Sequence, residues 1–108
     1  MTRAELLLLH AALAKDAGEL MARKNHDYAG AGAESPFANF EVAERLGICP
    51  TETGILVRLT DKVKRLVEFS KAGRLEVENE SVRDTVIDGV NYLVLLFAYL
   101  QHKAGRAT

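Results

Sequence analysis

Nine consecutive apolar residues, Tyr92 to Leu100, follow directly after a strongly polar segment near the end of the chain. A run of nine is too short to cross a bilayer, which takes about 20 apolar residues of helix. A helix that is apolar on every side is instead buried all round, in the centre of a bundle or in an interface between copies. The run therefore predicts that the last helix of this protein lies in such an interior.

The N-terminal segment shows the three- and four-residue spacing of an amphipathic helix. Thr2 and Glu5 fit a capping box, and the helix is expected to run from there to near Asn25, where HDYAGAGAES follows as a glycine-rich loop. Its apolar positions predict one buried stripe, widened by Leu7 and Leu8. The stripe consists of Leu6, Leu9, Leu13, Ala17 and Leu20.

A short second helix is expected after the glycine-rich loop. Ser35 is a favoured capping residue, Pro36 suits the first helical position, and Gly47 is a favoured left-handed terminator. Phe37 and Phe40 then lie on its inner face, either in the core or as walls of a pocket for a base. Asn39 between them is expected in solvent, with contact to a base edge as the alternative.

Two further long helices complete the predicted elements. The third spans about residues 53–71 and ends at Gly73, and the last begins at residues 79–81 and runs to about Lys103. RLEVENE connects them, with a brief extended stretch as an option. No sustained alternation of apolar and polar residues predicts a strand.

These elements predict an all-α fold: a small bundle of three long helices plus one short helix, completed by self-association. At 108 residues the chain forms a single α-helical domain, residues 1–108. Such a domain has too little interior to enclose both the leucine run at residues 6–9 and the apolar run at residues 92–100. Because soluble monomers tolerate an apolar patch of only a few hundred Å², a homo-oligomer, dimer or higher, is expected.

Composition excludes several classes of partner. The formal net charge is −1 and the charges are interspersed, so the basic stripe of a protein that binds duplex nucleic acid is absent from the sequence. Cys49 is the only cysteine, so no intrachain disulfide forms, and a cytoplasmic location is expected. The N-terminal ELLLLHAALA lacks a convincing cleavage site and is interpreted as a helix. No membrane partner is expected.

Three acidic residues precede the apolar run at a spacing of four: Glu80, Asp84 and Asp88. Positions four apart on a helix drift by about 40°, so the three carboxylates share one edge, with Asn91 beside them. Like charges at this spacing repel, which favours compensation by Mg²⁺ or by basic residues of the preceding helix. The alternative is a solvated face whose first acidic residues are stabilised by the helix dipole.

Basic and aromatic residues supply candidates for binding an anionic, planar ligand. In KNHDYAG, Lys24 offers charge, Tyr28 a ring face and the glycine close approach, with His26 as the weakest member. Alternatively, Asp27 ties the loop and Tyr28 fills the core. On the third helix, Arg58, Lys62 and Arg65 either lie on a solvated face, paired with Asp61 or Glu68, or meet the acidic edge or an anionic ligand.

Four motifs in order carry a family resemblance: KNHDYAG, SPFANF, RLTDKVKRL and ESVRDTVIDGVNY. Over about residues 20–103 the chain resembles the nucleotide-modification-associated α-helical domain family of phages. The resemblance implies a function connected with nucleotides in a general way only, because the name of that family reflects gene neighbourhoods.

A more distant likeness is to MazG-like all-α nucleoside triphosphate pyrophosphohydrolases, which hold magnesium with Glu-Glu-x-x-Glu and Glu-x-x-Asp motifs. Here Glu80 and Asp84 are four apart instead of three, and the first motif is missing. Magnesium-dependent hydrolysis needs several carboxylates. The departure therefore counts against catalysis more than against binding.

The predicted function is that of a phage-type nucleotide-binding protein in the host cytoplasm. It captures a nucleotide or nucleotide-derived ligand, with sequestration of a host immune signal as one role. The alternatives are a magnesium-dependent MazG-like pyrophosphohydrolase and a protein–protein interaction module, so enzymatic activity stays open. The predicted ligand-binding residues are Lys24, His26, Asp27, Tyr28, Arg58, Lys62 and Asn91, and the predicted ligands of a Mg²⁺ cofactor are Glu80, Asp84 and Asp88.

Overall fold

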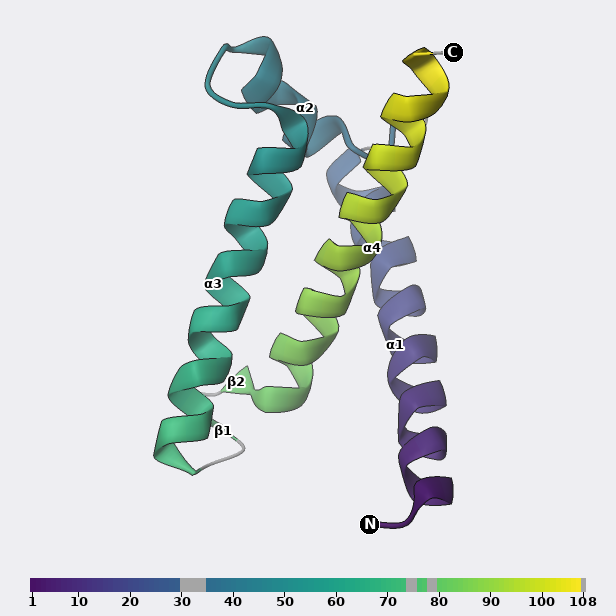
Figure 1. The fold of residues 1–108 in the computed structure, drawn as a ribbon, viewed down its shortest axis with the longest axis vertical. Coiled ribbons are helices and arrows are strands. Elements are labelled where there is room, and N and C mark those ends of the chain that lie inside the picture. The colour runs from purple at the N-terminus through teal and green to yellow at the C-terminus, as the bar shows by residue number, and fades with distance from the viewer. Residues whose placement is uncertain (30–34, 74–75, 78–79, 108) are drawn as a thin grey trace.

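The computed structural model describes the backbone of residues 1–29, 35–73, 76–77 and 80–107, and the side chains of residues 1–24, 35–73 and 81–106. The described residues form four helices, α1 (Arg3–Ala29), α2 (Ala38–Arg45), α3 (Thr51–Ala72) and α4 (Val82–Ala107) (Figure 1). A two-residue antiparallel ribbon, β1 (Glu76–Val77) and β2 (Glu80–Ser81), joins α3 to α4. The all-helical class, with three long helices and one short helix, is confirmed. The ribbon agrees with the brief extended stretch left open for RLEVENE, although its pairing was not predicted.

The long helices α3 and α4 form the central pair and run antiparallel, as Figure 1 shows. The C-terminal half of α1 leans on the N-terminal half of α4, where Arg83 pairs with Asp16 and the Asn91 side chain reaches the backbone oxygen of Ala17. The N-terminal half of α1 extends beyond this contact. The short helix α2 packs chiefly on α3.

The core lies where α2, the beginning of α3 and the C-terminal half of α4 meet. Phe37, Ile55 and Tyr99 form its buried cluster. The rings of Phe37 and Tyr99 meet edge to face with centroids 5.3 Å apart, a favoured aromatic geometry. Phe40 and Tyr92 pack against this cluster from the side. The predicted core role of Phe37 is therefore confirmed.

Local sequence signals explain most of the helix ends. Thr2 and Glu5 form the predicted capping box, with the amide of Glu5 donating to Thr2 Oγ1 at 3.1 Å and the amide of Thr2 donating to Glu5 Oε2 at 3.0 Å. Gly47 and Gly73 take φ angles of 75° and 65°, the left-handed region in which glycine lacks the steric cost of a Cβ. Both glycines end the helices they were predicted to end.

Two helix boundaries differ from the prediction and bear on the site. Helix α1 continues to Ala29, so the backbone of His26, Asp27 and Tyr28 is helical and does not begin the loop. The reason is that this stretch holds no glycine or proline to end the helix before Gly30.

The last helix begins at Val82, because the Ser81 hydroxyl caps it by accepting the amide of Asp84 at 3.0 Å. Glu80 therefore lies in β2, before the helix. The predicted helical edge of three acidic residues was wrong in this respect.

The remaining boundary differences are smaller. Helix α2 begins at Ala38 because the Ser35 hydroxyl accepts the amide of Phe37 at 3.1 Å and turns the chain before the helix starts. Helix α3 begins at Thr51, directly after Pro50.

The apolar runs are not buried within one chain. In α1 Ala17 is buried, but Leu6, Leu7, Leu8 and Leu9 are exposed. In α4 Tyr99 is buried, whereas Leu93, Val94, Phe97 and Leu100 are exposed. Burial of residues 92–100 in the centre of a bundle formed by one chain is therefore not what the structure shows, and burial in an interface between copies stays a prediction. Among the described residues, no helix combines the length and apolarity needed to span a membrane.

Candidate ligand-binding site

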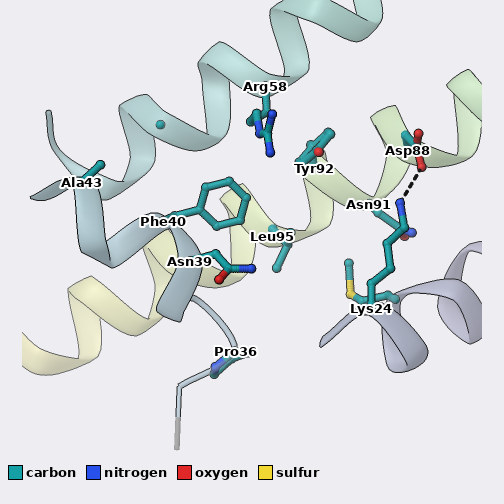
Figure 2. Close-up of a pocket in the computed structure, with 12 residues that line it drawn as sticks. Lys24, Pro36, Asn39, Phe40, Ala43, Arg58, Asp88, Asn91, Tyr92 and Leu95 are labelled. Atoms are coloured by element: carbon teal, nitrogen blue, oxygen red, sulfur yellow. Dashed lines mark hydrogen bonds and ion pairs between the residues drawn. The ribbon is translucent and has the colours of Figure 1, made fainter. Parts of the chain in front are cut away.

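A cavity of about 600 Å³ lies where all four helices approach one another (Figure 2). It falls within the 300–1,000 Å³ typical of small-molecule sites, and its walls are mostly apolar, as such sites usually are. Its lining residues are Met21 and Lys24 of α1, Pro36, Asn39, Phe40 and Ala43 of α2 and the turn before it, Gly54 and Arg58 of α3, and Asp88, Asn91, Tyr92 and Leu95 of α4.

Two cationic side chains reach this cavity from different helices. Arg58 enters from α3 and Lys24 from α1, on opposite sides of Tyr92 in Figure 2. No ion pair or hydrogen bond joins Arg58 to another residue of the part that the structure describes. A guanidinium that has no partner among the described residues and lines an apolar cavity suits an anionic group.

An aromatic pair forms part of the cavity wall. Phe40 and Tyr92 meet edge to face, with ring centroids 6.3 Å apart and an interplanar angle of 86°. Leu95 extends the same apolar surface along α4. Because the two rings are nearly perpendicular, the pair offers the face of one partly buried ring at a time to a planar ligand.

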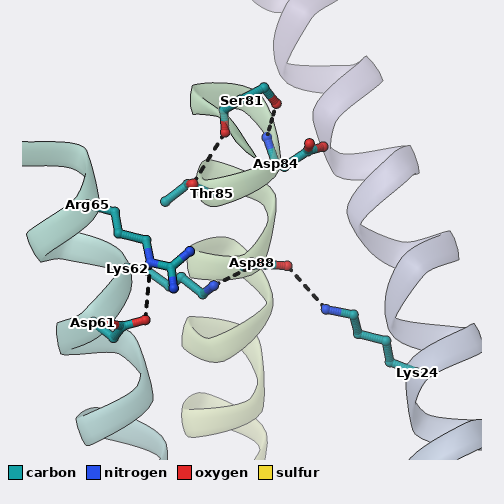
Figure 3. A network of polar contacts seen from close by, with 8 residues as sticks. All are labelled: Lys24, Asp61, Lys62, Arg65, Ser81, Asp84, Thr85 and Asp88. Atoms are coloured by element: carbon teal, nitrogen blue, oxygen red, sulfur yellow. Dashed lines mark hydrogen bonds and ion pairs between the residues drawn. The ribbon is translucent and has the colours of Figure 1, made fainter. Parts of the chain in front are cut away.

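Asp88 lies between two lysines from different helices (Figure 3). Its Oδ2 is 3.1 Å from Lys62 Nζ of α3, and its Oδ1 is 3.4 Å from Lys24 Nζ of α1. The side chains of Asp88 and Lys62 are 19% and 14% exposed, whereas that of Lys24 is 44% exposed. The sequence left open whether Mg²⁺ or a basic residue of the preceding helix balances the negative charge of Asp88. The structure shows a basic residue, Lys62 of α3, in this position.

Asn91 fastens α4 to α1. Its Nδ2 donates a 3.0 Å hydrogen bond to the backbone oxygen of Ala17. One of its two N–H donors is therefore engaged in helix packing, and the second N–H and the amide oxygen are left for a ligand in the cavity.

The structure brings together about half of the predicted site. Lys24, Arg58, Asp88 and Asn91 line the cavity, and Lys62 stands behind it through its ion pair with Asp88. Asp84 is exposed and points away from α3 in Figure 3. The side chains of His26, Asp27, Tyr28 and Glu80 lie outside the described residues.

The described carboxylates do not fit a magnesium site as they stand. No group of three His, Cys, Asp or Glu side chains converges among the described residues. Asp88 already has two ammonium partners, which compete with a metal cation for its oxygens. The magnesium prediction therefore stays a prediction.

Several lining residues were not predicted as site residues, of which Tyr92 is the most informative. Asp88, Tyr92 and Leu95 recur at i, i+4 and i+7, so they share one side of α4. That spacing was a usable signal, but the unbroken apolar run after residue 91 concealed it. Phe40 was considered for a pocket wall, and it lies there.

Comparison of the chain with protein-family models, with curated proteins and with solved structures finds no match. The resemblance to the phage nucleotide-modification-associated family thus remains an expectation from the motifs. The site has to be interpreted from its own geometry.

Proposed function

We propose that this protein binds a nucleotide or a nucleotide-derived ligand in the cavity between its four helices. The observation that carries the proposal is the position of Arg58, a cation without a described protein partner, at the mouth of a cavity walled by Phe40 and Tyr92. A nucleotide has the matching pair of features, because it joins an anionic phosphate to a planar base.

The phosphate is assigned to the Arg58 end of the cavity. A planar guanidinium forms two parallel hydrogen bonds with phosphate oxygens, and such charge-assisted bonds are stronger than neutral ones. Lys24 adds a second positive charge to the lining, and among the described lining residues the one carboxylate is that of Asp88. Since Lys62 also pairs with Asp88, Lys24 retains part of its positive field for an anion.

The base is assigned to the aromatic wall. Stacking on Phe40 or Tyr92 suits any base, because every base has a π face. Asn39 and the Asn91 amide, with its oxygen and its second N–H, supply polar groups for a base edge. A cavity of about 600 Å³ has the volume for a ligand of this size.

Binding without turnover is the proposed mode of action. Hydrolysis of a triphosphate needs several carboxylates that hold metal ions and activate water. Within the described part of the lining, the only carboxylate is Asp88, which is neutralised by two lysines. Capture of a nucleotide suits a role in nucleotide metabolism or the sequestration of a nucleotide signal.

A thermal-shift and calorimetry screen tests the proposal. The probes are mono-, di-, tri- and cyclic nucleotides, each with and without Mg²⁺, and a ligand that binds only the native state raises the melting temperature. Pyrophosphate release from each triphosphate is measured in parallel, and steady release would replace capture by hydrolysis. Absence of heat and of a melting shift with every nucleotide would refute the proposed function.

Two charge-matched variants locate the site. Arg58→Gln is expected to weaken binding by roughly 10- to 100-fold, since a hydrogen bond to a charged group contributes about 1.5–3 kcal/mol. Lys64→Gln removes the same charge from an exposed position of α3 outside the cavity lining and is expected to bind like the wild type. Equal affinities for the two variants would place the ligand elsewhere.

A further inference from the structure

The α3–α4 pair has an apolar side that nothing in the single chain covers. The exposed side chains on it are Leu56, Val63 and Val67 of α3 and Leu93, Phe97 and Leu100 of α4, and we term this surface the outer face. Phe97 is 65% exposed and Leu93 is 53% exposed. These are large side chains for which exposure to water is unfavourable.

Helical geometry places the outer face opposite the cavity. At about 100° per residue, Phe97 lies about 180° around α4 from Asp88, which lines the cavity. On α3, Leu56 lies about 160° around the helix from Gly54, another lining residue. The cavity and the outer face therefore occupy the two sides of the same helix pair.

The spacing of the outer face is that of a helix–helix seam. On α4, Val90, Leu93, Phe97 and Leu100 follow at intervals of three, four and three, the heptad pattern of packed parallel or antiparallel helices. On α3, Leu56, Thr60, Val63 and Val67 follow at four, three and four.

Neither stripe of the seam carries a charged residue, so the surface does not repel its own copy. The one hydroxyl, that of Thr60, donates to the backbone oxygen of Leu56 at 2.9 Å. It therefore needs no partner if the seam is buried.

The chain exposes more surface than folded monomers of its size do on average. Its accessible surface is 7813 Å² at 11.9 kDa, against about 6,000 Å² expected for a monomer of that mass. The excess of roughly 1,800 Å² exceeds the area, about 800 Å², that each partner buries in a standard interface. The radius of gyration, 15.9 Å, likewise exceeds the value of about 13 Å expected for this length.

We propose that the outer face packs against the outer face of a second copy of this chain. A twofold axis makes such a contact self-complementary, and α3 and α4 of both copies then form a four-helix bundle. The inference goes beyond nucleotide binding and does not depend on it. Because the cavity lies on the other side of each helix pair, the dimer leaves both cavities open.

Light scattering after size exclusion, at tens of micromolar protein, tests the proposal. The wild type is expected at twice the 11.9 kDa of one chain. Phe97→Glu places an unpaired charge in the seam, so the variant is expected at the mass of one chain. Ile48→Glu is the matched control, because Ile48 is 72% exposed but lies between α2 and α3 and is not part of the outer face, so this variant is expected to remain a dimer.

Circular dichroism on each variant separates dissociation from unfolding. A helical monomer for Phe97→Glu supports the proposal, and if that variant is unfolded, Val67→Glu on α3 is judged by the same criterion. A monomeric wild type overturns the proposal. So does a folded Phe97→Glu or Val67→Glu variant that keeps the wild-type mass. Nucleotide binding is measured on each monomeric variant as well. A variant that has lost the dimer but still binds a nucleotide shows that the dimer proposal and the nucleotide-binding proposal are tested separately.

Discussion

Lys62 Nζ of α3 lies 3.1 Å from Asp88 Oδ2 of α4, and less than a fifth of either side chain is exposed. This ion pair crosses the central helix pair at the base of the cavity. It fixes the direction of Asp88, whose other oxygen holds Lys24 of α1. One carboxylate thereby links three helices around the cavity.

Asp88→Asn is expected to destabilise the fold by about 1–3 kcal/mol. The substitution leaves the mostly buried Lys62 ammonium without this counter-charge, and removal of one partner from a fully buried pair costs about 3–5 kcal/mol. Partial exposure lowers that cost. The free energy of unfolding in urea measures the effect.

Two companion variants test the origin of the Asp88→Asn loss. Asp61→Asn breaks the exposed pair with Arg65 on the surface of α3 and is expected to cost under about 0.5 kcal/mol. Adding Lys62→Met to Asp88→Asn removes the stranded charge and is expected to recover part of the stability. An Asp88→Asn protein as stable as the wild type would show that the ion pair contributes nothing.

The aromatic wall gives a prediction for affinity. Tyr92→Leu is expected to weaken nucleotide binding by about 1–3 kcal/mol if the base stacks on the ring, whereas Tyr92→Phe keeps the ring face and most of the affinity. Calorimetric titration measures both variants.

Loss of stability is the competing effect, because Tyr92 also packs on the core and against Phe40. Urea unfolding of Tyr92→Leu and Tyr92→Phe accompanies the titrations. A Tyr92→Leu protein that unfolds at a lower urea concentration but binds at wild-type affinity would show that Tyr92 acts only as a core residue.

Local signals in the sequence predicted the helices well, and pairing across helices much less. The capping box at Thr2 and the terminating glycine Gly73 depend on residues within one turn, so both were predicted. The ion pair of Lys62 with Asp88 depends on how α3 packs on α4, which the sequence left as one option beside a metal ion. Glu80 was misplaced because the Ser81 cap competes with an earlier start of the helix.

The exposed apolar runs show a second limit of prediction from the sequence. The spacing of Leu93, Phe97 and Leu100 predicts a buried stripe, as it does for any helix that packs against another element. In one chain these side chains face solvent. Apolar periodicity predicts that a helix face is buried, but it does not tell whether the residues that bury it belong to the same chain.

The ion pair between Glu52 and Lys103 predicts how stability depends on pH. Lys103 Nζ donates to Glu52 Oε2 at 2.8 Å and joins the first turn of α3 to the end of α4. This hydrogen bond is the main reason that the pKa of the Glu52 carboxyl lies below its ordinary value, and the same bond raises the pKa of Lys103. A carboxyl with a lowered folded-state pKa stabilises the fold above its ordinary pKa, near 4.3, and loses that contribution as the pH falls through the folded-state value.

Glu52→Gln is therefore expected to melt below the wild type at pH 6–7, with the gap closing as the pH falls below about 4. Melting curves of both proteins from pH 7 to pH 3 measure the gap. Glu68→Gln, an exposed position on the same helix, is the control, and its curve is expected to run parallel to that of the wild type. If the difference in melting temperature between Glu52→Gln and the wild type stays constant down to pH 3, the loss of stability comes from packing at the start of α3 and not from the charge. A gap that closes for Glu52→Gln alone would assign the acid sensitivity to this ion pair.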